Sequence, residues 1–135
     1  MIEEKDVILR EVQQLNELLK VLIRKVNDFE SNNEASSIEE INVKLKNHFK
    51  FSIQELSEMP TENFILVVKN WNEVHHEKMI MLLYLLITKS TETIIPIDKE
   101  ALIEKTLLLI TLLDEKSKTY SIERVQLKNT LQQWS

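Results

Sequence analysis

The sequence contains no glycine in 135 residues. Glycine supplies the positive-φ residues of tight β-hairpin turns and lets the backbone approach a phosphate closely. Without it, hairpins, glycine-rich nucleotide loops and nucleophile elbows lose their usual chemistry. The remaining composition is dominated by helix formers such as Leu, Glu, Lys, Ile and Gln, with two prolines. We therefore expect an all-α fold of six to seven helices.

Length and composition indicate a single domain over residues 1–135. Hydrophobic residues make up 43% and charged residues 29%, as in globular proteins. The net charge of −5 argues against a nucleic-acid or acidic-membrane partner. Cysteine is missing, the start lacks a signal-peptide pattern, and the longest apolar run, Met79–Ile87, is too short to span a membrane. These features predict a soluble cytoplasmic protein without a cofactor.

Residues 1–31 are expected to contain a long amphipathic N-terminal helix, from about Glu3 to Phe29. Its apolar residues recur at heptad spacing, alternately four and three residues apart, at Ile8, Val12, Leu15, Leu19, Leu22, Val26 and Phe29. The first six of these would form a self-association seam that pairs with the same helix of another copy. Alternatively, the helix packs along its own domain, and apolar residues beside the seam favour this second interpretation. A helix with one face inward and another at a dimer contact combines the two.

Helix-start signals divide the remaining body, residues 37–135. Ser37 with Glu40, and Ser52 with Glu55, have the spacing of capping boxes. The helix that follows Ser52 is expected to stop before Pro60, because the residue before proline disfavours helical geometry.

Two strongly apolar helices are expected at about Glu73–Lys89 and Lys99–Asp114. We expect them to form a central antiparallel hairpin with the long first helix lying across it. Another helix is expected near Thr61, carrying Trp71 inward. Asp98 is the expected cap of the second helix of the hairpin. The last predicted helix covers about Ser121–Gln133, with Leu127, Leu131 and Trp134 as its inward stripe.

The best candidate for a metal site is Glu73 with His76. Their i, i+3 spacing is the half-motif of di-iron carboxylate bundles. The second half is missing, because Leu45 stands three residues before the only other separate histidine, His48. We expect His75 and His76 to be structural or solvent-exposed, and we keep a metal-binding helical bundle that uses Glu73 and His76 as the alternative function.

Two further groups of residues are expected to be structural. The basic residues form a solvated helix surface, and the large rings anchor the core. The basic group is Lys44, Lys46, His48 and Lys50, and the rings are Trp71, Tyr84, Tyr120 and Trp134.

Two segments carry a resemblance to a known group. The opening DVILREVQQL (6–15) and the later LLITLLDEKSKTYSIER (108–124) resemble an uncharacterised group of bacterial tetratricopeptide-like helical proteins. The resemblance implies a tetratricopeptide-like, α-solenoid-like bundle and a bacterial origin, and no activity or site residue. Bulky residues such as Leu83 stand where true repeats carry small ones.

The sequence contains no recognisable catalytic constellation. We therefore predict a non-catalytic helical module for protein interaction or self-assembly, not an enzyme. Its partner would be an unidentified protein or a second copy in a homodimer, and neither a nucleic acid nor a membrane.

Overall fold

The computed structural model describes residues 4–27, 34–89, 98–117 and 121–134, and all regular structure in these ranges is α-helical. The prediction of an all-α chain is therefore confirmed for the described residues. Among them, no helix combines the length and hydrophobicity needed to cross a membrane. The helices in this part of the chain are α1 (Glu4–Asn27), α2 (Glu34–Phe49), α3 (Ile53–Glu58), α4 (Thr61–Val68), α5 (Glu73–Lys89), α6 (Lys99–Lys116) and α7 (Ile122–Trp134).

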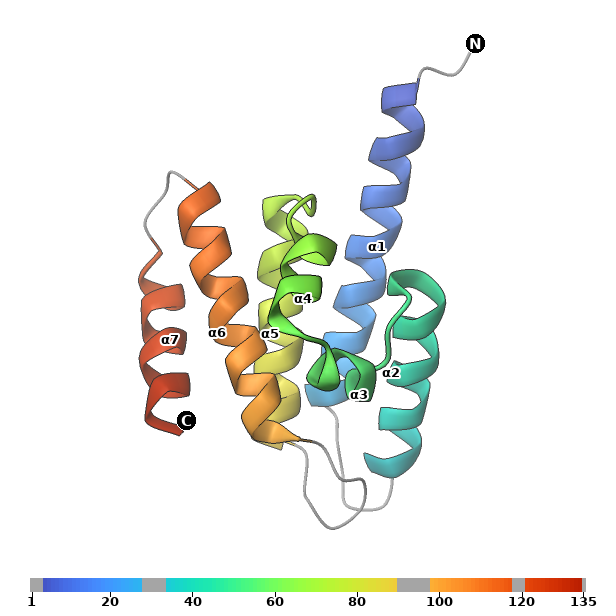
Figure 1. Ribbon diagram of the computed structural model, residues 1–135. Helices are drawn as coiled ribbons and strands as arrows, with labels where there is room; N and C mark the ends of the chain where they lie inside the picture. The colour runs from blue at the N-terminus through green and yellow to red at the C-terminus, as the bar shows by residue number, and fades with distance from the viewer. Residues whose placement is uncertain (1–3, 28–33, 90–97, 118–120, 135) are drawn as a thin grey trace.

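Helix α5 is the centre of the molecule (Figure 1). It packs most extensively against α1 on one side and α6 on the other. Helix α7 lies beyond α6, and α2 lies beyond α1, so five long helices stand side by side. The short helices α3 and α4 cover the front of this layer and contact α6. The predicted antiparallel hairpin of α5 and α6 is confirmed.

The position of α1 differs from the prediction. It runs beside α5 in the same direction, rather than across the hairpin (Figure 1). At their C-terminal ends, Nζ of Lys89 donates a hydrogen bond of 3.3 Å to the carbonyl oxygen of Asn27. In a solenoid each repeat contacts its neighbours in sequence, whereas α1 makes its largest contact with a helix four elements later. The tetratricopeptide-like arrangement is therefore not confirmed.

The hydrophobic core draws fully buried side chains from both ends of the chain. Leu22 comes from α1, Phe64 from α4, Leu83 from α5, Leu109 from α6 and Leu131 from α7. Because α5 has neighbours on several sides, its apolar residues are not confined to one stripe. This distribution explains why a helix with an almost continuous apolar sequence lies at the centre.

Local sequence signals place several helix starts correctly. Ser52 caps α3, and its side chain and that of Glu55 form the predicted capping box. The side chain of Asp98 accepts a hydrogen bond from the main-chain N–H of Ala101 and caps α6. Helix α3 also ends before Pro60, as the proline rule predicts.

Two local predictions are wrong. The capping box at Ser37 is not used, because α2 already begins at Glu34 and Ser37 lies inside it. An acidic residue and Ala35 favour the earlier start, since glutamate complements the helix dipole and alanine is the best helix former. Helix α4 ends at Val68, so Trp71 lies in the turn that follows rather than on the helix.

The C-terminus of α2 shows how this chain turns without glycine. Lys50 follows the helix with φ of 72°, the left-handed conformation that glycine usually occupies. Its main-chain N–H donates to the carbonyl oxygen of Lys46, and its Nζ donates to that of Asn47. A lysine therefore takes both the conformation and part of the capping role of the missing glycine.

Candidate functional site

The predicted seam of α1 is divided by the structure into two parts. Leu19, Leu22 and Val26 are fully buried within the chain, in the core that α1 shares with α5. Leu15 is partly buried against the same core. The interpretation of all six positions as a free self-association seam is therefore wrong for its C-terminal half, because these side chains already pack inside their own domain.

The N-terminal part of α1 extends beyond the other helices (Figure 1). The hydrogen bond from Nζ of Lys89 to Asn27 places the C-terminal ends of α1 and α5 near each other, and α5 begins 16 residues before Lys89. Both helices rise about 1.5 Å per residue, so the start of α5 is level with about residue 11 of α1. The projecting segment therefore contains the seam position Ile8, and Val12 lies at its border. Both residues belong to α1, and their side chains lie outside the described part of the structure.

A groove between α5 and α7 forms a second candidate surface. It has a volume of about 250 Å³, and α1 contributes Ile23 to its lining. Its apolar lining includes Met81, which is 38% exposed. The other residues that line it are Glu77, Lys78, Ile80, Ser121, Glu123, Arg124 and Leu127. The sequence pattern does not reveal this groove, because it depends on where α7 lies relative to α5.

Arg124 holds α7 against the bundle at this groove. Its side chain is buried, its Nε donates to Oδ1 of Asp114 at 2.9 Å, and its Nη1 donates to Oε1 of Glu77 at 3.0 Å. The guanidinium thus links three helices, α7, α6 and α5. The two carboxylates remain about half exposed, so water still solvates part of each charge.

The adjacent histidines are both buried, as structural residues. They lie in an aromatic cluster with Phe49, Phe51 and Trp71. The ring centroid of Trp71 lies 6.4 Å from that of His75 and 5.9 Å from that of His76. This cluster joins the end of α2, the turn before α5 and α5 itself. Sequence reasoning left the histidines either structural or exposed, and the structure shows that both are buried.

The ring nitrogens of His76 differ in their surroundings. Nε2 lies 2.9 Å from the carbonyl oxygen of Val68. Nδ1 is buried without a hydrogen-bond partner among the described residues. Burial lowers the pKa of His76, and the nearby charge of Lys116 lowers it further, while the Val68 carbonyl and Glu73 oppose these effects.

The geometry gives no support to a metal centre at Glu73 and His76. Nε2 of His76 is already occupied by a main-chain carbonyl, and Glu73 is exposed. Within the described ranges, no three histidine or carboxylate side chains are grouped so that they could hold a metal ion. A site with one free imidazole nitrogen and one exposed carboxylate lacks the donors that a transition metal requires.

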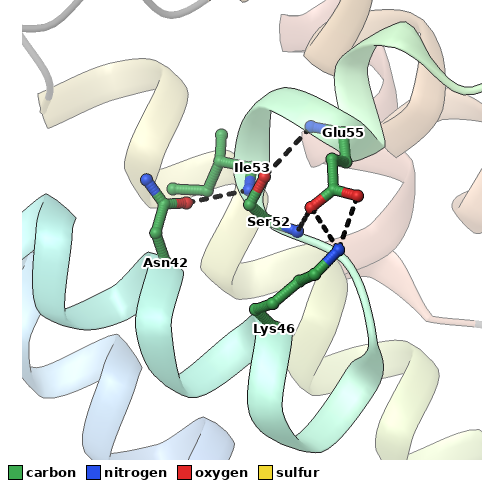
Figure 2. A network of polar contacts seen from close by, with 5 residues as sticks. All are labelled: Asn42, Lys46, Ser52, Ile53 and Glu55. Carbon is green, nitrogen blue, oxygen red and sulfur yellow. Dashed lines mark hydrogen bonds and ion pairs between the residues drawn. The ribbon is translucent and has the colours of Figure 1, made fainter.

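The predicted basic surface contains an ordered junction between α2 and α3, shown in Figure 2. Nζ of Lys46 forms an ion pair with Glu55 at 2.7 Å, and this hydrogen bond lowers the pKa of Glu55. Oδ1 of Asn42 accepts a hydrogen bond of 2.9 Å from the main-chain N–H of Ile53. The Lys46 charge is thus partly neutralised, which weakens any reading of this region as a basic binding patch.

The prediction that Trp134 belongs to an inward stripe is wrong. Its side chain is 45% exposed, while Leu131 on the same helix is fully buried. The Trp134 ring stacks on Tyr84 of α5, with centroids 6.0 Å apart and an interplanar angle of 11°. Tyr120, the remaining large ring, lies outside the described residues.

Comparisons with protein-family models, curated proteins and solved structures yield no match for this chain. The chain is therefore not assigned to a family, and its function has to be argued from its own geometry.

Proposed function

We propose that this chain is a non-catalytic helical module for protein interaction, with self-assembly through α1 as its form. The observation that carries the proposal is the projection of α1 beyond α5 (Figure 1). The C-terminal half of the apolar stripe is buried against the chain's own core, and the same heptad pattern continues into the projecting segment. A second α1 segment is the simplest partner, because a heptad stripe is complementary to another heptad stripe.

The surroundings of the projecting segment agree with this proposal. Its first residues carry both acidic and basic side chains, Glu4, Lys5, Asp6, Arg10 and Glu11. A mixed-charge flank accommodates an antiparallel copy, in which opposite charges meet across the seam, more readily than a flank of one sign. A cytoplasmic location is part of the same proposal.

The test is the oligomeric state of the full chain, measured by light scattering or sedimentation over a range of concentrations. We expect a dimer that dissociates on dilution. The variant with Ile8→Lys and Val12→Lys should be monomeric, because two charges would enter the seam. A matched variant with Gln13→Lys and Gln14→Lys carries the same added charge at exposed positions and should keep the dimer.

A wild-type chain that is monomeric at every concentration would contradict self-assembly. So would a dimer that both variants weaken equally, since the effect would then be one of net charge. Leu19 is unsuitable for this test, because it is fully buried and a lysine there would disrupt folding.

A further inference from the structure

The turn between α4 and α5 is closed by two side chains that reach its carbonyl groups. Nε2 of His76 lies 2.9 Å from the carbonyl oxygen of Val68. Nζ of Lys116, from the end of α6, donates to the carbonyl oxygens of Lys69 and Trp71. These carbonyls follow the last turn of α4, where helical partners run out. The two side chains therefore tie α4 and the turn to α5 and α6.

The hydrogen bond to Val68 fixes the tautomer of His76. A carbonyl oxygen only accepts, so Nε2 must carry the ring proton and Nδ1 must present a bare lone pair. Nδ1 is buried and has no partner among the described residues. A second proton on this ring would thus form an N–H group without an acceptor, in a residue that is only 1% exposed.

Charged groups around His76 also affect how readily its ring takes up a second proton. Lys116 faces the ring from α6 and disfavours the positive charge, while Glu73 on α5 favours it. Helix α4 contributes the Val68 carbonyl, which Nε2 already uses. Burial has the largest effect and, with Lys116, lowers the pKa of His76, which favours the neutral ring in the closed structure.

The segment around this turn packs over less surface than the two central helix pairs. Helices α3 and α4 have six and eight residues. They pack on α6 over a smaller surface than the contacts of α1 with α5 or of α5 with α6. Segments with fewer buried contacts open locally at a lower free-energy cost than the whole molecule. Exposing the His76 ring to water by moving this turn is therefore easier than unfolding the core.

We propose that His76 is an acid-sensitive latch, in which a proton taken up at Nδ1 releases the α4–α5 turn, with Trp71, while α1, α5 and α6 stay packed. Acid weakens closure because the ring is neutral in the closed form. Closure is at full strength above the pKa of a free histidine, near 6.5, and weakens as the pH falls below it. The closed-to-open ratio drops up to tenfold per pH unit until the ring in the closed form also takes up a proton.

The test uses Trp71 as a reporter. The chain has two tryptophans, so Trp134→Phe leaves Trp71 as the only one. Its fluorescence and the far-ultraviolet circular dichroism would be followed from about pH 8 to about pH 5, above the range in which carboxylates titrate. We expect a red shift of the Trp71 emission with the slope of a single proton, while the helical signal is retained.

Variants assign the transition to His76. In His76→Gln the amide still donates to Val68 but takes up no proton, so the transition should disappear. His75→Gln is the matched control in the same cluster and should keep it. Lys116→Gln retains a donor without the charge. It should shift the transition to lower pH and make it shallower, because the closed form then tolerates the second proton better.

Three results would overturn the latch. They are an unchanged Trp71 emission in this range, loss of the helical signal together with the shift, and a transition that survives in His76→Gln. If His76→Gln does not fold, the wild-type chain decides by nuclear magnetic resonance. Ring signals of His76 and the indole signal of Trp71 should titrate together, and an indole signal that stays constant while His76 titrates would refute the proposal.

Discussion

At the scale of single residues, Lys50 shows the conformational cost of a chain without glycine. Its φ of 72° brings Cβ close to its own carbonyl, which costs a non-glycine residue about 1–2 kcal/mol. We predict that Lys50→Gly raises the free energy of unfolding by about 0.5–1 kcal/mol, somewhat less than this cost because glycine also has a more flexible unfolded state. Urea denaturation measures the change.

The matched control is Lys50→Ala. This variant also removes the hydrogen bond from Nζ to Asn47, but it keeps Cβ, so it should gain no stability. If the glycine and alanine variants are equally stable, the left-handed backbone does not carry the cost assigned to it.

The hydrogen bonds of single side chains join groups at different separations along the chain, and this separation determines which of them the sequence predicts. Ser52 and Asp98 cap helices through main-chain groups three residues away, so their roles were predictable. Asn42 satisfies the N–H of Ile53 eleven residues away, and His76 binds the carbonyl of Val68 across a turn. These partners depend on how two helices meet, and spacing alone does not give that.

At the scale of elements, the attachment of α7 includes an asymmetric ion cluster. Arg124 is buried, whereas its partners Glu77 and Asp114 are 56% and 43% exposed. Arg124→Met keeps most of the packed stem and leaves two carboxylates that water can solvate. The double variant Glu77→Ala, Asp114→Ala instead removes two acceptors from a buried guanidinium.

We therefore predict that the double variant loses more stability than Arg124→Met, by roughly 1–3 kcal/mol. Urea denaturation of both variants gives the comparison. Equal losses would mean that the guanidinium gains enough water, or enough other contacts, when its two carboxylates are removed.

The elements themselves were mostly predictable, and their partners were not. The heptad positions of α1 correctly describe one face, and Leu19, Leu22 and Val26 are all buried. The same pattern is compatible with pairing to another copy or to a helix of the same chain, because both partners present apolar side chains. Only the tertiary structure shows that α5 takes the C-terminal half of this face.

At the scale of the whole molecule, the apolar content of each helix predicted what lies at the centre. Both helices with long apolar runs, α5 and α6, pack against each other inside the described bundle. The parallel course of α1 beside α5 was not predictable, because it is set by contacts between segments about sixty residues apart.

The centre of the bundle is where substitutions should be most costly. Leu83 of α5 and Leu109 of α6 are fully buried in the shared core. Replacing either by alanine removes buried methyl groups and leaves a cavity, and we predict a loss of about 2–5 kcal/mol in each case. Leu66 of α4 is 60% exposed, so Leu66→Ala is the matched control and should change stability by less than about 0.5 kcal/mol. Thermal and urea denaturation measure all three variants. Comparable effects at Leu66 and Leu83 would show that α5 is not enclosed by its neighbours, and the central position of that helix would have to be abandoned.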